Sequence, residues 1–442
     1  MLALALLTVL VFDPLSVLAP GFWLSFAAVA VILYAVSRQF DRPWREKIVA
    51  WGKLQWAIAL GMLPLLLLLF QQVSVSGPVA NLVAIPVIEI IVIPATLLGV
   101  VASTTLPDSV ASWPFLLAHQ TLTWLWPWLE TLARLPITLW SQHAPPLWAV
   151  LAALVGAALL LAPRGWPARW LGLLWLLPMV LLRPAAPTAG AAWLTLLDVG
   201  QGLAVVVRTA THTLVYDTGA RYSARFDAGS AVILPYLRHE GLRRVSTLII
   251  SHGDNDHIGG SSALLARLPV DRILSSVPGR LPAAEPCRSG QFWTWDDVRF
   301  EILHPANGGK LRGNDRSCVL RIETRYGQAL LPGDISARAE RFLVREQPQR
   351  LAATVLVAPH HGSRSSSTEP FIDRINPKLV LLPVGYRNSY RHPHPDVLAR
   401  YRERGIEVVD SPSAGAIQVR FDPAGWRVDR DRDLRRRYWH RR

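Results

Sequence analysis

The chain has 442 residues, of which 51% are hydrophobic and only 18% charged, so it is not an intrinsically disordered protein and is unusual for a purely soluble one. Its two cysteines exclude a disulfide-rich scaffold and a Cys-rich zinc module. The net charge of +14 is uneven: residues 191–442 carry 37 Lys and Arg against 26 Asp and Glu, a net charge of +11. The chain therefore divides into an apolar first part and a basic second part.

The apolar first part predicts a polytopic α-helical membrane domain over residues 1–183. A bilayer core about 30 Å thick needs about 20 apolar residues per helix. About six segments approach that length, namely 22–37, 54–70, 79–101, 113–129, 147–162 and 169–182. Residues 1–11 are apolar but too short to span, and they lack the basic leader of a signal peptide. We therefore expect this segment to be the end of a helix that begins before the chain does.

Basic residues predict the orientation of these helices. The loop 38–53 contains Arg38, Arg42, Arg45, Lys47 and Lys53. Short loops rich in Lys and Arg stay in the cytoplasm, so we place this loop there. Counting the spans onward from it places the basic second part outside the cytoplasm.

Polar residues interrupt the third predicted span. Asn81, Pro86, Glu89 and Pro94 lie within 79–101. The two prolines remove helix hydrogen bonds, and a carboxylate inside a bilayer is costly. The pattern favours a broken helix that lines a polar path, with Asn81, Pro86 and Glu89 as pore residues. The alternative is a kinked helix in which Glu89 pairs with a neighbour.

A Pro- and Ala-rich linker at 184–192 precedes a change to short β-type runs, which predicts an α/β domain at 193–422 and a basic tail at 423–442. The predicted strands are 193–198, 203–208, 213–217, 246–251, 298–303, 318–323, 328–332, 354–358, 379–384, 406–410 and 416–421. Helices are predicted at 228–240 and 336–346.

Potential metal ligands gather where these strands end. The segment 247–260, TLIISHGDNDHIGG, runs from an apolar strand into four ligand-type residues, His252, Asp254, Asp256 and His257. Such charges repel each other unless a cation neutralises them. Other predicted strands end in the same way, at Asp217, at Asp334, at His360 and His361, and at Asn388, His392 and His394. The ordered set predicts a metal-dependent hydrolase. Two bound cations would activate water, so no Ser or Cys nucleophile is needed, and Cys287 and Cys318 are expected to be structural or incidental.

These segments resemble the metallo-β-lactamase superfamily and, within it, the C-terminal domain of the ComEC family of competence DNA-uptake channels. The resemblance is carried by LDVGQG at 197–202, SHGDNDHIGG, LPGD, PHHGSRSSS and NSYRHPH, in that family's order. DPLSVLAPGFWLSFAA at 13–28 and GPVANLVAIP at 77–86 resemble its competence domain. The family usually carries earlier helices and an N-terminal soluble domain, so the chain is expected to be N-terminally truncated relative to it.

The resemblance implies an αββα sandwich on a multi-pass protein of the cell inner membrane. It implies that the helices pass single-stranded DNA during natural transformation and that the metal domain hydrolyses DNA phosphodiester bonds. The partners it implies are single- and double-stranded DNA, membrane lipid and other DNA-uptake machinery.

The resemblance also implies roles for individual residues. The implied metal ligands are His252, Asp254, Asp256, His257, Asp334 and His360 or His361, with Asp334 as the bridging ligand. Asp254 stands where the superfamily commonly has His, and the segment Asn314–Ser317, rather than His304, takes the place of its middle His. We assign catalytic roles to Asp256, Asp334 and Asp217, and substrate binding to Ser363, Arg364, Asn388, Arg391, His392 and His394. Two divalent ions are expected, with Mn²⁺ favoured for activity by the hard oxygen ligands and Zn²⁺ also able to bind.

Positive charge points to a polyanionic substrate. Arg364, Arg387 and Arg391 lie beside the proposed ligands, and Ser365–Ser367 either donate to phosphate or form a loop. The seven Arg of residues 430–442 could bind DNA or anionic lipid, or simply solubilise the tail. Two alternatives stay open: a membrane-anchored hydrolase of a small ester or phosphodiester, and a non-catalytic DNA-binding domain on a channel.

Overall fold

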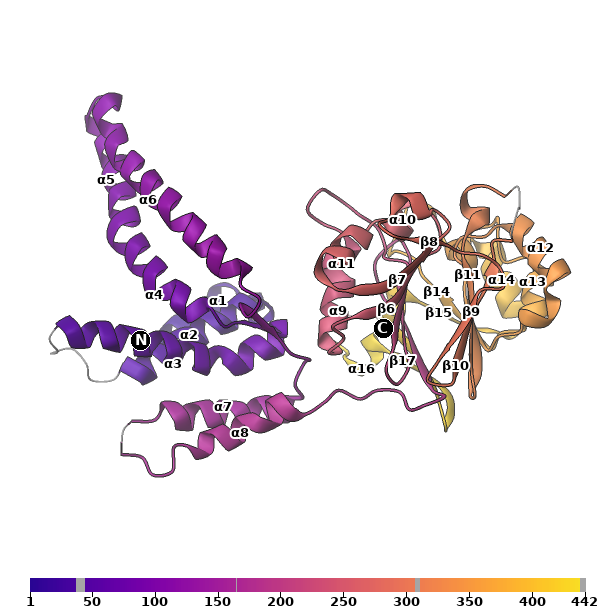
Figure 1. Ribbon diagram of the computed structural model, residues 1–442, viewed down its shortest axis with the longest axis horizontal. Helices are drawn as coiled ribbons and strands as arrows, with labels where there is room; N and C mark the ends of the chain where they lie inside the picture. Colours follow the sequence, from indigo (N-terminus) through magenta and orange to yellow (C-terminus); the bar gives the residue numbers. More distant parts are fainter. Residues whose placement is uncertain (37–43, 164, 307–310, 438–442) are drawn as a thin grey trace. The chain divides into compact units, whose positions relative to one another are not determined.

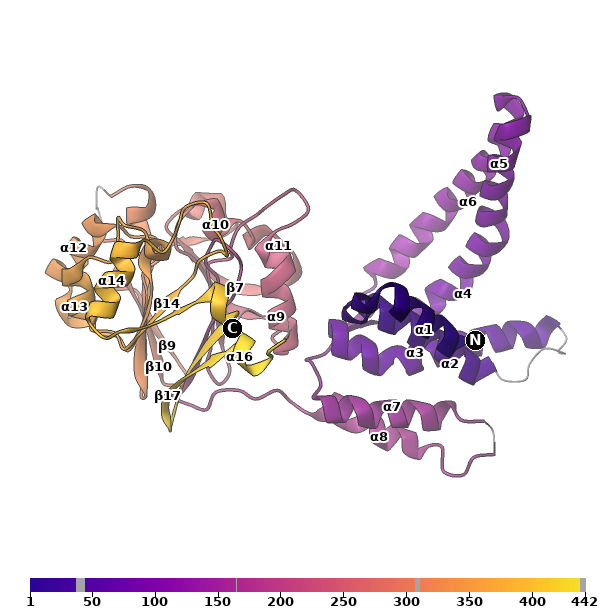
Figure 2. The same cartoon turned by 180° about the vertical axis from the view of Figure 1, so that it is seen from behind.

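The computed structural model describes residues 1–36, 44–163, 165–306 and 311–437. The chain divides into two units (Figures 1 and 2). The first consists of Met1–Pro184 and Arg238–Gly241, and the second of Ala185–Leu237 and Leu242–Arg442. Each unit has buried hydrophobic clusters of its own.

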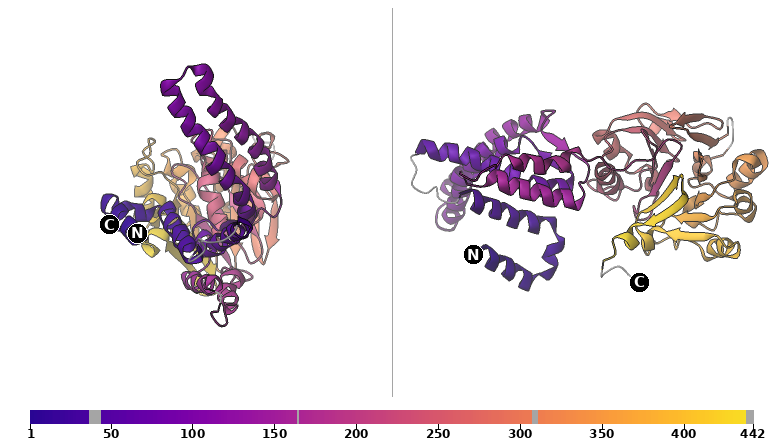
Figure 3. Two further views of the ribbon diagram at one scale, coloured as in Figure 1. Left: turned by 90° about the vertical axis from the view of Figure 1, so that its left-hand side faces the viewer. Right: turned by 90° about the horizontal axis from the view of Figure 1, so that it is seen from below.

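The first unit is helical because its sequence is a nearly continuous run of Leu, Ala, Val and Trp with few polar positions. Its helices are α1 (Leu2–Phe12), α2 (Pro20–Val36), α3 (Trp44–Phe70), α4 (Gly77–Val87), α5 (Ile93–Thr105), α6 (Asp108–Arg134), α7 (Leu147–Leu161) and α8 (Leu171–Leu181). A 3₁₀ turn at Pro14–Leu18 and a two-stranded sheet of β1 (Gln72–Ser74) and β2 (Leu139–Ser141) connect them. Helices α5 and α6 run side by side as a hairpin (Figure 3), and a side chain at Gly99 would collide with the ring of Phe115.

Two helices of the described residues are long and apolar enough to cross a membrane, Val49–Phe70 and Gly77–Thr105. Four shorter apolar helices accompany them, Leu2–Phe12, Pro20–Ala35, Leu147–Leu161 and Leu171–Leu181. The six predicted spans fall on helices, but the span predicted at 113–129 lies on α6, which is not among these six apolar helices, and crossing of a membrane stays a prediction. The basic segment predicted as a loop at 38–53 is helical from Trp44, and its residues 38–43 lie outside the described part of the chain.

The predicted break in the third span is not a break. Helices α4 and α5 are joined by a π-helical turn at Ile88–Val92, in which the N–H of Ile93 bonds to the carbonyl of Ile88. The wider turn keeps the helix continuous close to Pro94, which has no N–H to donate. Glu89 lies on this turn and is exposed, and among the described residues it makes no hydrogen bond or ion pair. Asn81 is exposed on α4, and Pro86 is half-buried one turn before Glu89.

The second unit contains two sheets whose strands are the apolar, β-branched runs of the sequence. The first sheet has the order β17-β16-β3-β4-β5-β6-β7-β8, formed by β17 (Gly425–Arg430), β16 (Ile417–Asp422), β3 (Ala192–Leu196), β4 (Val205–Arg208), β5 (Thr213–Tyr216), β6 (Val245–Ile250), β7 (Val270–Ser275) and β8 (Glu285–Pro286). The second has the order β15-β14-β13-β12-β11-β10-β9, formed by β15 (Glu407–Asp410), β14 (Leu379–Leu382), β13 (Val355–Val357), β12 (Gly327–Leu331), β11 (Val319–Thr324), β10 (Val298–His304) and β9 (Phe292–Trp295). Strands β5 to β8 are parallel, as are β12 to β15.

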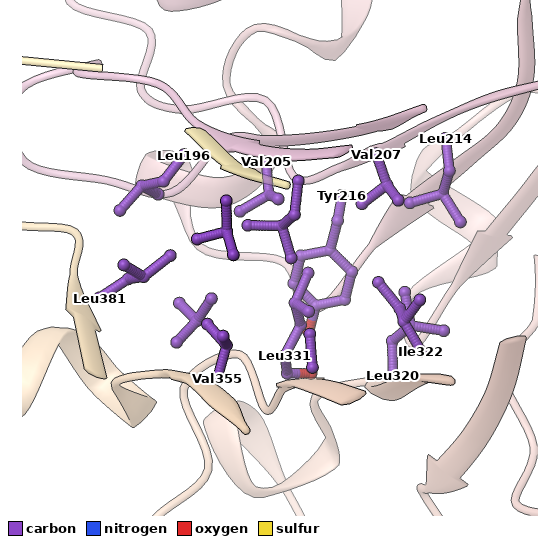
Figure 4. Close-up of a cluster of buried hydrophobic side chains, with 14 of the residues drawn as sticks. Leu196, Val205, Val207, Leu214, Tyr216, Leu320, Ile322, Leu331, Val355 and Leu381 are labelled. Carbon is purple, nitrogen blue, oxygen red and sulfur yellow. The ribbon is translucent and has the colours of Figure 1, made fainter. Parts of the chain in front are cut away.

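The two sheets pack face to face over the largest buried cluster (Figure 4). Leu196 and Val205 from one sheet oppose Val355 and Leu381 from the other. Two further clusters fill the outer faces of the sheets beneath the helices. The helices are α9 (Leu234–His239), α10 (Asn255–Ile258), α11 (Ser261–Arg267), α12 (Ala337–Glu346), α13 (Glu369–Ile375), α14 (Pro395–Glu403), α15 (Ser411–Ala414) and α16 (Asp431–Leu434), with shorter turns at Gly229–Ile233, Pro278–Arg280, Gly313–Arg316, Pro348–Arg350 and Pro359–Gly362. The predicted αββα architecture is confirmed.

Two features of this unit differ from the prediction. The domain does not end at residue 422, because β17 pairs with β16 along its whole length and α16 follows it. Only the end of the predicted tail is left over, and its last five residues, 438–442, lie outside the described part. Cys287 and Cys318, which were not predicted to pair, form a disulfide. It links the residue after β8 in one sheet to the residue before β11 in the other.

Candidate metal centre

The predicted ligands meet because parallel strands of both sheets end at the same place. Asp217 follows β5, and the segment 252–257 follows β6. Asp334 follows β12 in the other sheet, and His360 and His361 follow β13. The carboxyl ends of parallel strands share one edge of their sheet, so apolar strands deliver polar side chains to one point.

Four side chains form the centre of this cluster: Asp256, His257, Asp334 and His361. One ligand atom from each can be chosen so that all four lie within 4.8 Å of one another. The Nε2 atom of His257 lies 3.2 Å from Asp334 Oδ1 and 3.2 Å from His361 Nε2. The Nε2 atom of His361 lies 3.3 Å from Asp256 Oδ2 and 3.4 Å from Asp334 Oδ2. All except Asp256 are buried, and Asp256 is half-buried.

Asp334 also faces a second group of predicted ligands. Its Oδ2 atom lies 4.0 Å from His252 Nε2 and 3.8 Å from His360 Nε2. His252 Nε2 is 3.5 Å from Asp254 Oδ2, and Asp254 is 61% exposed. Asp334 thus has the shared position expected of a bridging ligand between a buried site and a more open one. His361 lies in the buried group of four, and His360 lies with the more exposed group.

The donor set fits divalent metal ions. Imidazole nitrogens and carboxylate oxygens in these numbers suit Zn²⁺ or a harder first-row ion, with no thiolate among them. The Nε2 atom of His252 is buried and has no hydrogen-bond partner in the described residues, although it points at two carboxylates. A buried nitrogen with no partner is costly unless a ligand satisfies it. His252, Asp254, Asp256, His257, Asp334, His360 and His361 are therefore the residues that would hold the ions.

Hydrogen bonds fix the ligating imidazoles from behind. Asp217 Oδ2 accepts from His257 Nδ1 at 2.7 Å, and the carbonyl of Pro383 accepts from His361 Nδ1 at 2.7 Å. Both bonds leave the Nε2 atoms facing the centre, as in the carboxylate–histidine–metal arrangement. Asp217 is fully buried and also accepts from the backbone and hydroxyl of Ser251. It is thus a positioning residue, and the catalytic role predicted for it does not match its place behind the ligand.

The backbone at the ligands is held in an uncommon conformation. His360 and His361 have φ of 51° and 54°, and Gly362 follows at 74°. Left-handed conformations cost energy for residues other than glycine and concentrate at functional sites, where the surrounding structure enforces them. This turn buries the side chain of His361, whereas the side chain of His360 is 27% exposed. Asp217 also has a left-handed backbone, with a φ of 60°, and its carboxylate bonds to His257.

Opposite charges act on one another within the cluster. Burial alone would lower the pKa of both inner histidines, but nearby carboxylates outweigh it. Asp334 and Asp256 raise the pKa of His361 to about 9, and Asp334 and Asp217 raise that of His257 well above its ordinary value. Burial would raise the pKa of Asp334, but the two histidines hold that pKa well below the usual range. The pKa of His252 is lowered, mainly by burial and by its neighbour His257. The inner histidines and carboxylates therefore stabilise one another's charged forms.

The residues predicted to bind substrate surround the centre but serve several purposes. Ser363 bonds to Ser365, whose hydroxyl lies 3.3 Å from His360 Nδ1. Arg364 is exposed and lies 3.4 Å from Asp396. His394 caps α14 by accepting from the N–H of Asp396. None of these contacts prevents a role with substrate, but Ser363 and His394 have structural partners already.

The other predicted residues lie on the loop 385–391 or directly after it. Asn388 is a structural brace, because its amide donates to the carbonyls of Gly385 and His392 and accepts from the N–H of His392. The ring of His392 lies 6.2 Å from that of His360, and Arg391 is exposed. His304, the residue set aside as a ligand, is buried and donates to the carbonyl of Asp315.

The sequence did not reveal several contributors. Ser251 joins Asp217 to His252 and His257 through its hydroxyl, and its place just before His252 was the only available signal. Ser317 lies in the segment 314–317 that the resemblance placed near the centre, and its hydroxyl accepts from the N–H of Asp334 at 3.2 Å, a contact that was not predicted. Glu340 is buried on α12, where it accepts from the N–H groups of Ser367 and Thr368 and fixes the serine loop. Burial raises the pKa of Glu340 to about 7.

Family models match both parts of the chain. Residues 1–167 match the family model for the competence protein, and residues 197–385 match that for the metallo-beta-lactamase superfamily. The chain is 35% identical to the competence protein ComA of Neisseria gonorrhoeae, over 99% of this chain and 60% of that protein. It is 32% identical to the uncharacterized protein YcaI of Escherichia coli (strain K12), over 98% of this chain and 58% of that protein.

Among solved structures, CmlA, a diiron beta-hydroxylase from Streptomyces venezuelae, is 15% identical and has a TM-score of 0.34, over 56% of this chain and 55% of that one. The chain spans a little under two thirds of the length of the two curated relatives, 60% and 58%.

Proposed function

We propose that this chain serves DNA uptake and that its metal centre hydrolyses DNA phosphodiester bonds, because its residues 1–167 match the family model for the competence protein and its residues 197–385 match that for the metallo-β-lactamase superfamily. The observation that carries the proposal is the buried cluster around Asp334, in a chain whose helical part matches the competence protein family model. A domain that only binds DNA has no need of His257 and His361 fixed from behind by Asp217 and Pro383.

The chain's own residues would prepare the site in three ways. His257 and His361 present Nε2 atoms to a buried position, while Asp334 faces both that position and the more open one beside His252. Metal ions bound there would activate water and stabilise negative charge on phosphate oxygens. Asp256 is half-buried, so substrate can approach from its side. Asp254 adds a hard oxygen ligand, which favours Mn²⁺ for activity although imidazole also suits Zn²⁺.

The helical unit would pass single-stranded DNA through the cell inner membrane. Support comes from the competence family match, from two helices of sufficient length and from four shorter apolar helices. Glu89 gives the path a polar residue, exposed on a π-helical turn within the longer apolar helix. Turns of this kind occur often at functional sites.

Hydrolysis is tested directly with the full chain in detergent. We expect it to degrade single-stranded oligonucleotides and to nick plasmid in the presence of Mn²⁺, more slowly with Zn²⁺, and not with EDTA. Gel analysis of labelled DNA measures the rate, and a neutral nitrophenyl ester serves as the comparison substrate. Ester hydrolysis without any DNA cleavage would favour the small-molecule alternative, and metal-independent binding of DNA without cleavage would favour the binding domain.

The disulfide supports an extracytoplasmic position for the metal domain. Disulfides persist in oxidising compartments and are rare in the cytosol. Because Cys287 and Cys318 are the only cysteines in the chain, thiol counting is unambiguous. We expect chain isolated from cells under thiol-blocking conditions to show no free thiol before reduction and two after it. Labelling of both cysteines in unreduced chain would place the domain in the cytoplasm, and Cys287→Ser is the one-thiol reference.

A further inference from the structure

Exposed aromatic rings concentrate beside the metal centre. The described part of the second unit has six exposed large hydrophobic side chains, and four are aromatic residues on two loops. Tyr222 and Phe226 lie on the loop 221–227, and Tyr386 and Tyr390 on the loop 385–391; their exposed fractions run from 51% to 67%. Clustered exposed apolar side chains mark a binding site, whereas single exposed ones need no explanation.

The first loop is attached to the ligand segment itself. The N–H of Arg221 donates to Asn255 Oδ1 at 3.3 Å, and Asn255 Nδ2 donates to the Arg221 carbonyl at 3.0 Å. Asn255 stands between the ligands Asp254 and Asp256. The Tyr222 hydroxyl donates to the Val199 carbonyl at 2.5 Å, and its ring lies 5.5 Å from that of Phe226. The two rings are thereby held at the edge of the metal centre.

The second loop reaches the same centre through a series of neighbouring rings. The Tyr390 ring is stacked on His392 with centroids 5.9 Å apart and planes 20° apart. His392 in turn lies 6.2 Å from the ring of His360, which faces Asp334.

One turn holds both loops. Gln201 accepts from the N–H of Gly385 at 3.0 Å, and Val199 accepts from Tyr222. Leu203, two residues after Gln201, donates its N–H to the Asp256 carbonyl at 3.0 Å. The segment 197–203 therefore connects the two aromatic loops to each other and to the ligands.

The composition of the loops identifies what the rings would hold. Residues 221–226 are RYSARF and residues 386–391 are YRNSYR, so each loop alternates two arginines with two aromatic residues. Arg225 and Arg391 are exposed. Rings that stack on bases, combined with arginines that contact phosphates, are the means by which proteins hold single-stranded nucleic acid. In a duplex the base faces are already stacked, so this chemistry selects unpaired bases.

We propose that Tyr222, Phe226, Tyr390 and His392 form an aromatic clamp that stacks on unpaired nucleobases of a DNA strand and feeds that strand to the metal centre. The clamp rests on the proposed function, because the strand that it holds is the one that the centre would cut. Arg225 and Arg391 would contact the flanking phosphates.

Binding of two matched oligonucleotides to the full chain tests the clamp. One is a single strand with bases, and the other has the same length and charge but abasic sites throughout. Fluorescence anisotropy should give wild type a Kd roughly 10-fold or more lower for the strand with bases. Phe226→Ala and Tyr390→Ala should each lose most of that preference, whereas Tyr390→Phe should keep it. Phe292→Ala, an exposed ring on β9, is the control and should also keep it.

The two proposals fail separately in this experiment. Equal Kd values for the two strands in wild type, or an unchanged preference in Phe226→Ala and Tyr390→Ala, would overturn the clamp even if DNA is cut. Tighter binding of a duplex than of the single strand would overturn it as well. Base-dependent binding that the variants lose, without cleavage in any metal ion, would support the clamp and refute the nuclease.

Discussion

Replacing Asp334 with alanine is expected to abolish metal binding and DNA hydrolysis. Its two oxygens face both groups of ligands, within 3.2 Å of His257 and within 4.0 Å of His252. The change therefore weakens both ion positions at once and removes the carboxylate that offsets the charge on His257 and His361. A ligand of this kind contributes several kcal/mol of transition-state stabilisation, so the rate should fall at least about 100-fold. Metal content by plasma emission spectrometry and DNA cleavage rates check both effects.

Two comparison variants make the Asp334 result interpretable. Asp254→Ala should have a smaller effect, because this carboxylate is 61% exposed and lies outside the buried group of four. Asp271→Ala removes an exposed partner of Arg244 and should leave metal content and rate unchanged. Substantial metal content and cleavage in Asp334→Ala would refute the bridging position.

The ligand cluster was predictable because strands carry their own signal. An apolar run such as that before His252 forms a buried strand, and the polar residues that follow it must lie at the sheet edge. Asp334 and His361 follow strands of the same kind in the second sheet. Strand ends predict where ligands gather, and four of the five predicted ends, those after β5, β6, β12 and β13, deliver residues to the cluster.

The direction in which each side chain points was not predictable. Asp217 follows a strand like the others, yet its left-handed backbone turns it behind His257. Consecutive residues His360 and His361 have the same chemistry, and only the conformation of that turn separates the inner ligand from the outer one. Such choices depend on tertiary contacts that place each residue, as with the carbonyl of Pro383 that bonds to His361.

Sequence rules based on single residues also placed the ends of two structural elements wrongly. Two prolines in 79–101 suggested a broken helix, but a π-helical turn at Ile88–Val92 accommodates the lost hydrogen bonds without a break. The charged segment after residue 422 read as a tail, yet Gly425–Arg430 is an edge strand on β16. Charge is compatible with an edge strand because one side of it faces water.

Metal affinity is expected to rise steeply with pH, as protons leave the inner cluster. Nearby carboxylates raise the pKa of His361 to about 9 and the pKa of His257 well above its ordinary value, in spite of burial. An imidazole must be neutral to bind a metal ion, so binding near pH 7 displaces up to two protons from this pair. Below those pKa values, protons compete with the metal ion for the imidazole nitrogens and weaken its binding. The logarithm of the affinity should then rise by up to about two per pH unit near neutrality and level off at higher pH.

Proton counting on wild type and Asp217→Asn separates this competition from a general effect of pH on the fold. Calorimetric titration of the metal at pH 7 in buffers of different ionisation enthalpy gives the number of protons released per ion. The variant removes one carboxylate that holds the His257 proton, so fewer protons should leave on binding. Its affinity should still fall about 10- to 100-fold, because His257 loses the partner that orients it. Lower affinity together with lower proton release is a combination that simple unfolding does not produce. If wild type binds metal with no proton release and no dependence on pH between 6.5 and 9, then the inner histidines are already neutral without metal, and the ion-pair account of the empty cluster is wrong.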